Sequence, residues 1–415
     1  MRILIISTFF PPLNSIASHR PHSFAKYWTE AGHDVTVLTT KKEIPSEEKL
    51  SLPNPGYEVI EVSLPSIYYK MKRSRKKNKN SSDTPSSSSF QKMRDKYGIF
   101  NSCRMPDFTD LWVYPAFKRI KNEEPWDVIL SSSGPYTAHL VAYLLKKRNK
   151  ASRWVADYRD PWCDSHSFPG LFPFTLIERS LERIILKQAD LITPNGDALS
   201  RFYENKFNRP TMTVPNGFDP PNLLPDSEFP FPKDKKFRIC YTGSVYEQQN
   251  PALLFQAIRQ LRNDPLINKL EVRFYGYSNR LLSQLIKDHQ VEKWVKICDP
   301  VSFLESVRIQ KESDLLLFLP WNDPKRKEVL PAKIYEYLYS QTPIICIGAK
   351  SLDDSQKLIM EAKAGESFHN VETVVSFLKC QLCSEKRLKV NIDTKLLEKY
   401  HRKTIALKLL DRISL

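Results

Sequence analysis

The chain has 415 residues, of which 41% are hydrophobic, and its formal net charge is +16. This length and apolar content predict two compact domains and exclude a largely disordered chain. The longest apolar runs have the length of strands, which excludes a helix that crosses a membrane. Seven scattered cysteines and a start without a signal peptide predict a protein of the reducing cytoplasm.

Strand-like and helix-like patterns alternate over residues 1–220. Apolar runs predict strands near 2–10, 34–40, 57–64, 127–133, 153–160, 190–195 and 211–217. Amphipathic patterns predict helices near 18–31, 110–122, 136–148, 174–188 and 198–207. This alternation predicts parallel strands, right-handed crossovers and a first Rossmann-like, doubly wound domain.

A basic segment interrupts this domain. Residues 70–79 carry seven lysines and arginines, and a serine-rich stretch follows up to about residue 90. Such a composition cannot bury apolar surface, so we expect a disordered insertion at 70–90. Its charge suits an anionic membrane surface, nucleic acid, or water alone. We expect no nucleic-acid partner, because the segment lacks the interleaved aromatic residues of single-strand binders.

A second domain follows a proline-rich linker at 221–236. Residues 237–393 repeat the alternation of strands and helices, which predicts a second Rossmann-like domain. Residues 394–413 have the pattern of one long amphipathic helix, so the segment 394–415 could pack back on the first domain. Parallel sheets bind ligands outside the carboxyl ends of their strands, so we expect a site in a cleft between the two domains.

The stretch EVLPAKIYEYL, from Glu328 to Leu338, follows an expected strand. Pro331 suits the first turn of a helix, and Lys333 and Glu336 then share one face near its N-terminus. Exposed N–H groups and a lysine suit a phosphate, and a carboxylate one turn later can accept hydrogen bonds from ribose hydroxyls. Glu328, in the preceding loop, could contact a sugar ring. Taken alone, Lys333 and Glu336 could equally be an ordinary surface pair.

Other segments match one family in order along the chain. The segment 328–348, with its two glutamates, resembles the donor-binding segment of glycosyltransferase family 4, and 7–20 resembles that family's first loop. The segments 155–162 (VADYRDPW), 214–219 (VPNGFD) and 241–244 (YTGS) resemble its fifth-strand motif, its end-of-domain signature and the start of its second domain. The resemblance covers nearly the whole chain and fits the bacterial, polysaccharide-type group 1 enzymes.

This resemblance implies an α/β architecture of the GT-B type, in which two Rossmann-like domains face a central cleft. It implies a retaining enzyme whose second domain holds a nucleotide-diphosphate sugar and whose first domain holds the acceptor. The matching donor-binding positions are Gly243, Ser244, Pro331, Lys333 and Glu336.

The chain departs from the family at two phosphate-binding positions. Asn14 and Ser15 stand where the family usually has a glycine pair, and the segment after Gly243 lacks the usual arginine and lysine. A less permissive loop and a weaker diphosphate clamp are therefore expected. The remaining candidates for neutralising a diphosphate are Lys333, the backbone at Gly243 and Ser244, Arg20 and Arg159.

The catalytic candidates are Glu328, Asp157, Arg159 and Asp160, the last three at the expected end of a strand. Asp157 or Asp160 could orient or deprotonate an acceptor hydroxyl, and Arg159 could neutralise a carboxylate or contact a phosphate. These three residues could equally form a structural network.

Ser15, His19 and Arg20 are candidates for the acceptor or cleft side, because they lie near the first loop and the start of the first helix. His139 is a further candidate. Its competing interpretation is a polar position within the helix expected at 136–148.

The sequence contains no D-x-D and no His, Cys and Asp cluster with metal-ligand spacing, so we expect neither a metal nor another cofactor. Helix N-termini and cationic side chains would then assist departure of the diphosphate. We expect transfer of a hexose-type sugar to a glycan or lipid-linked acceptor in surface polysaccharide or lipopolysaccharide assembly, with peripheral contact at the inner face of the membrane. The alternatives are a sugar-nucleotide epimerase and a noncatalytic sugar-nucleotide-binding or scaffold protein.

Overall fold

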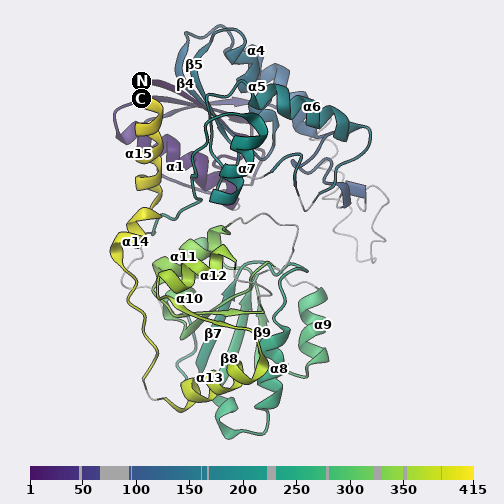
Figure 1. The fold of residues 1–415 in the computed structure, drawn as a ribbon. Coiled ribbons are helices and arrows are strands. Elements are labelled where there is room, and N and C mark those ends of the chain that lie inside the picture. The colour runs from purple at the N-terminus through teal and green to yellow at the C-terminus, as the bar shows by residue number, and fades with distance from the viewer. Residues whose placement is uncertain are drawn as a thin grey trace. The chain divides into compact units, whose positions relative to one another are not determined.

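The computed structural model describes residues 1–45, 49–65, 93–94, 96–159, 161–165, 168–221, 230–276, 280–321, 330–348, 353–384 and 386–415. These residues form two compact units (Figure 1). The first unit contains Met1–Pro215 together with Arg402–Leu415, and the second contains Asn216–His401. The chain therefore returns to the first unit at its C-terminal end.

The first unit is built on a parallel sheet with the strand order β3-β2-β1-β4-β5-β6. Its strands are β1 (Arg2–Ile6), β2 (Asp34–Thr40), β3 (Glu58–Val62), β4 (Trp126–Ser132), β5 (Ala151–Asp157) and β6 (Leu191–Ile192). Its helices are α1 (Ile16–Glu30), η2 (Phe108–Trp112), α4 (Val113–Ile120), α5 (Thr137–Lys146), α6 (Phe174–Leu186), α7 (Asp197–Phe207) and α15 (Arg402–Ser414). This is the strand order of a Rossmann fold, with a topological switch between β1 and β4.

The second unit repeats that topology in the order β12-β11-β10-β7-β8-β9. Its strands are β7 (Phe237–Thr242), β8 (Leu270–Tyr275), β9 (Val295–Cys298), β10 (Leu315–Phe318), β11 (Ile344–Ile347) and β12 (Gly365–Phe368). Its helices are α8 (Ala252–Gln260), η3 (Pro265–Lys269), α9 (Arg280–Asp288), α10 (Phe303–Glu312), α11 (Ala332–Ser340), α12 (Asp354–Glu361), α13 (Val371–Cys383) and α14 (Thr394–Lys399). The predicted pair of doubly wound α/β domains is confirmed.

The strands are apolar on both faces because helices pack against each side of the sheet. In β7, Ile239 and Tyr241 belong to one buried cluster while Cys240, pointing the other way, belongs to another. All residues of β10 and β11 are buried. Continuous apolar strands are typical of parallel sheets with both faces covered, so polar residues at strand ends are the places to look for a site.

The C-terminal segment differs from its predicted form. One helix was expected at 394–413, but the structure has α14 and α15, separated at Tyr400. The carbonyl of Tyr400 accepts a hydrogen bond from the backbone N–H of Phe218 at 3.0 Å, so the chain pairs with a neighbouring segment where a continuous helix was predicted. Helix α15 packs on α1, where the indole of Trp28 donates to the carbonyl of Ala406 at 2.8 Å.

Two further predicted elements are altered. The helix predicted at 110–122 begins with the 3₁₀ turn η2 and continues as α4. The strand predicted at 211–217 is reduced to one bridge between Ile192 and Thr211. Pro215 lacks an N–H group, which limits pairing along this segment.

The insertion predicted at 70–90 and most of the predicted linker lie outside the described residues. In the described end of that linker, Phe231 is buried, with the guanidinium groups of Arg238 and Arg273 at 4.9 and 5.6 Å from its ring centre. Among the helices of the described residues, none combines the length and the apolarity needed to cross a bilayer.

Candidate functional site

Helix α11 begins at the carboxyl end of the second sheet, after β10. Its N-cap is Pro331, in an extended conformation, and no side chain caps the first-turn N–H groups. Lys333 and Glu336 lie in the first two turns, and both are half-buried. The uncapped N-terminus and the lysine suit an anion, as the sequence predicts. Glu328 lies outside the described residues.

The amino group of Lys333 is held over an aromatic ring. Its Nζ lies 3.5 Å from the ring centre of Tyr241, which is buried on β7. Burial lowers the pKa of Lys333 to about 7, and the negative charge of Glu336 only partly opposes this effect. A lysine desolvated in this way gains most from an anionic ligand, because such a ligand restores the stability of its protonated form.

Two glycines make room for this lysine at the end of β7. Gly243 has a φ of +116°, and a Cβ atom there would lie 3.1 Å from the Nζ of Lys333. A Cβ atom on Gly276 would lie 2.5 Å from the carbonyl oxygen of Gly243, which no side chain could tolerate. The close approach of the β7 and β8 ends therefore depends on both glycines.

The backbone at Gly243 does not have the availability that the sequence suggests. Its N–H donates to the carbonyl of Tyr275 at 2.7 Å, so this group is engaged within the sheet rather than offered to a phosphate. The carbonyl of Ser244 accepts a hydrogen bond from the hydroxyl of Tyr241 at 3.0 Å. The contribution of Gly243 is thus the space it leaves beside Lys333.

Glu336 is oriented by a glutamine that the sequence analysis missed. The amide Nε2 of Gln310, on α10, donates to Glu336 at 3.3 Å and to the hydroxyl of Thr242 at 3.0 Å. Gln310 is fully buried, and its Oε1 has no hydrogen-bond partner within the described part of the chain. Only its position on the buried face of α10 could have drawn attention to it.

In the first unit, Asp157 ends β5 and is fully buried. Its carboxylate accepts hydrogen bonds from Arg20, with a shortest distance of 2.6 Å from Nη2, from Ser132 Oγ at 2.7 Å and from Thr193 Oγ1 at 2.9 Å. Although burial raises the pKa of this carboxyl, Arg20 and the two hydroxyls outweigh it, so the net pKa is lowered. This geometry favours the structural interpretation of Asp157 over the predicted catalytic one, because both oxygens are occupied.

Arg20 belongs to the same network and not to an open binding surface. It is buried, and its Nη1 donates to the carbonyls of Val214 and Pro215 at 2.7 and 2.8 Å. It therefore joins α1 to the end of β5 and to the segment that leaves the first unit. The neutralising partner of Asp157 is Arg20, whereas the sequence analysis considered Arg159.

Arg159 lies at the same edge of the sheet but is half-buried. Its Nη1 is 3.4 Å from the carbonyl of Ala17, and its Nη2 would lie 3.3 Å from a Cβ atom on Gly134. Ser15 caps α1 by accepting a hydrogen bond from the N–H of Ala17 at 3.3 Å. Arg159 and the first turn of α1 are thus together at one place, whereas Asp160 lies outside the described residues.

The two candidate histidines lie in different environments. His19 is half-buried, and burial together with Arg402 and His22 lowers its pKa to about 3, which keeps the ring neutral. His139 is fully buried and its Nδ1 is 2.7 Å from the hydroxyl of Ser131. The prediction of His139 as a cleft residue is not supported, because its ring packs in the core beside Tyr158. Burial also lowers its pKa to about 4.

Among the described residues, no group of three or more His, Cys, Asp or Glu side chains is arranged to hold a metal ion. The predicted absence of a metal stays a prediction, as does the predicted cleft between the domains.

No protein-family model matches the chain, and no curated protein sequence matches it. Solved structures do match its fold over nearly its whole length. Sucrose-phosphate synthase from Thermosynechococcus elongatus has a TM-score of 0.66 at 13% identity, covering 99% of this chain and 98% of its own. Anabaena HepE, in complex with UDP and glucose, has a TM-score of 0.63 at 13% identity, covering 100% and 99%.

The UDP-GlcNAc 2-epimerase from Methanocaldococcus jannaschii has a TM-score of 0.53 at 13% identity, covering 99% of this chain and 98% of its own. The fold is GT-B. At these identities the likeness extends to the fold of two Rossmann-like domains, and the chemistry of this chain has to be argued from its own residues.

Proposed function

We propose that this GT-B protein is a retaining glycosyltransferase, of the family 4 type, that transfers a sugar from a nucleotide-diphosphate donor to a glycan or lipid-linked acceptor. The observation that carries the proposal is Lys333 and Glu336 in the first turns of a helix whose N-terminus no side chain caps. We place the reaction in cell-surface polysaccharide assembly, at the cytoplasmic face of the membrane.

The donor fits the residues around α11 in a specific order. The diphosphate would lie at the N-terminus of α11, where the backbone N–H groups and Lys333 neutralise it. The ribose hydroxyls would donate to Glu336, whose carboxylate is already held by Gln310 at 3.3 Å. Departure of the nucleoside diphosphate would then be assisted by fixed dipoles and one cation, without a metal ion.

The first unit would supply the acceptor side. Arg159 and His19 are our candidates there, because both are half-buried and lie near the carboxyl edge of the sheet. A neutral His19 could accept a proton or a hydrogen bond from an acceptor hydroxyl.

The comparisons support the donor class. The HepE structure contains UDP and glucose, so a protein of this fold and length accommodates that kind of ligand. The epimerase of the same fold keeps a second enzyme class open, but the matches at the first loop and at the end of the first domain favour a transferase.

A noncatalytic sugar-nucleotide-binding protein is the second candidate. The N–H of Gly243 is occupied by Tyr275, and no arginine or lysine occurs among residues 244–250. The diphosphate clamp is therefore weaker than the family resemblance implies, which favours binding over turnover in this alternative.

Incubation of the protein with a panel of nucleotide sugars and candidate acceptors separates these functions. Release of nucleoside diphosphate with a new glycoside, absent in the double variant K333M/E336Q, is the expected result. Thermal protection by UDP or GDP without turnover would support the binding protein, and an epimerised nucleotide sugar would support the epimerase.

A further inference from the structure

Helix α6 buries its charges and exposes its apolar residues. Glu178 and Glu182 are 0% and 1% exposed, whereas Leu176, Ile177 and Ile184 are 57%, 47% and 52% exposed. A surface helix normally has the opposite arrangement, with its apolar stripe against the core. The sequence alone would bury the isoleucines, so this orientation needs a physical cause.

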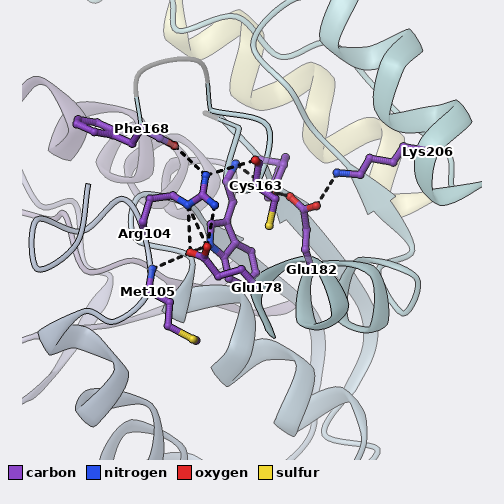
Figure 2. A network of polar contacts seen from close by, with 9 residues as sticks. Arg104, Met105, Cys163, Phe168, Glu178, Glu182 and Lys206 are labelled. Atoms are coloured by element: carbon purple, nitrogen blue, oxygen red, sulfur yellow. Dashed lines mark hydrogen bonds and ion pairs between the residues drawn. The ribbon is translucent and has the colours of Figure 1, made fainter. Parts of the chain in front are cut away.

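Glu178 is compensated by a set of donors that point at it from neighbouring loops. Figure 2 shows the guanidinium of Arg104 beside the carboxylate of Glu178, at 2.8 Å from Nη2 to Oε2. The backbone N–H of Met105 donates to the same carboxylate at 2.7 Å, and the indole of Trp162 donates at 3.0 Å. A buried carboxylate with this many donors is stable in its place.

Glu182, one turn later, is held in the same way. Lys206 on α7 lies 2.5 Å from its Oε2 (Figure 2), and the N–H of Cys163 donates to it at 3.2 Å. The hydroxyl of Tyr158 donates to it as well. These contacts fix the rotation of α6 about its axis, so the apolar residues on its other side face outward.

The outer face of α6 carries two parallel rows. Leu176, Ser180 and Ile184 follow each other at intervals of four residues, and Arg179, Arg183 and Lys187 form the adjacent row. All six residues are exposed. Within the described residues, none of the three basic side chains takes part in a hydrogen bond or an ion pair.

The segment before the helix extends this face. Phe172 is 75% exposed and lies two residues before the first residue of α6. An aromatic ring, branched aliphatic side chains and an adjacent row of unpaired cations form one continuous surface, which we call the α6 face: Phe172, Leu176, Ile177, Arg179, Arg183, Ile184 and Lys187.

We propose that the α6 face lies on an anionic membrane surface. The apolar row would enter the boundary between headgroups and acyl chains, and the basic row would contact the anionic headgroups. A protein partner fits less well, because the cores of protein interfaces are depleted in charged residues, whereas half of this face is cationic. The proposal is independent of the donor chemistry.

Cosedimentation of the full-length protein with vesicles tests this proposal. The vesicles are neutral phosphatidylcholine, or phosphatidylcholine mixed with phosphatidylglycerol. We expect binding to the anionic vesicles that weakens with salt. The variants L176Q/I184Q and R179E/R183E should each weaken the binding at least about tenfold, since each basic residue near the surface contributes about 1 kcal/mol.

Two controls match these variants in chemistry. R259E/R262E reverses two exposed arginines at the end of α8 in the second unit, and M360Q replaces an exposed apolar residue of α12. Both should bind vesicles like the unmodified protein. Circular dichroism and thermal melting of every variant would show that the fold is intact, which is expected because the substituted side chains are exposed.

Several outcomes would overturn the proposal. These are failure of the unmodified protein to bind anionic vesicles, equal losses in the control variants, and loss only when residues 70–89 are deleted. Self-association that L176Q/I184Q abolishes would instead make the α6 face a contact between copies of the chain. Sugar transfer to a water-soluble acceptor is measured in parallel, so that a failure of lipid binding is distinguished from a failure of the proposed enzyme activity.

Discussion

Two charged pairs at strand ends, one in each unit, have opposite physical characters. Asp157 and Arg20 are both buried and satisfied by several hydrogen bonds within the first unit. Lys333 and Glu336 are half-buried, and the pKa of Lys333 is lowered to about 7 because Glu336 does not fully compensate its burial. A saturated pair stabilises the fold, whereas an incompletely compensated cation at a helix N-terminus is suited to a ligand.

The largest effect is expected at the saturated pair. Asp157→Asn leaves the guanidinium of Arg20 buried without its counter-charge, so we expect the free energy of unfolding to fall by about 3 to 5 kcal/mol. Thermal and urea denaturation measure this loss, and Asp411→Asn, at an exposed carboxylate of α15, is the matched control. An unchanged melting temperature with abolished transfer would make Asp157 catalytic and reverse the comparison.

Glu336→Gln tests the opposite member of the comparison. It removes a charged acceptor for the ribose hydroxyls, so we expect kcat/KM for the donor to fall about tenfold to a hundredfold. The melting temperature should stay close to that of the unmodified protein. Glu361→Gln, at an exposed position of α12, should change neither quantity. If Glu336→Gln unfolded the protein, this residue would belong with Asp157 as a structural group.

The pH dependence of nucleotide binding sharpens the difference between the two cations. Lys333 loses its proton above a pKa of about 7, and a bound diphosphate favours the protonated form. The affinity for UDP or GDP should therefore fall as pH rises, by up to about tenfold per unit above 7. Calorimetric titration between pH 6.5 and 9 measures this slope, which should disappear in Lys333→Met. An unchanged slope in that variant would assign the titration to another group.

The smallest effect is expected at the glutamine that orients Glu336. Gln310→Met removes the Nε2 donor while keeping a side chain of similar length, so we expect donor affinity to fall about threefold to tenfold. The comparison variant is Gln260→Met, at the exposed end of α8. Fluorescence or calorimetric titration with nucleoside diphosphate measures both, and equal affinities would mean that Gln310 does not position Glu336.

The sequence predicted the fold well because the deciding patterns are local. Apolar strands such as β10 and amphipathic helices such as α11 are visible in windows of a few residues, and their alternation leaves few topologies. The uncapped start of α11 was also visible, because Pro331, Lys333 and Glu336 are close in sequence.

The partners of the site residues were less visible because they come from distant parts of the chain. Arg20 lies 137 positions before Asp157, and Gln310 lies 26 positions before Glu336. The outward rotation of α6 was hidden for the same reason, since it depends on Arg104 and Lys206. Periodicity predicts that a helix forms, but the distribution of buried charge decides which side faces the core.

The return of α15 to the first unit makes that unit noncontiguous. The hydroxyl of Ser414 is 4.0 Å from the sulfur of Met1, so the two ends of the polypeptide meet. Residues 216–401 can therefore be excised as one uninterrupted piece, whereas a fragment stopping at residue 215 would leave Trp28 without the carbonyl of Ala406. Deleting a few residues from the C-terminus damages the N-terminal domain, and joining the two ends by a short peptide offers a circular permutant that keeps it whole.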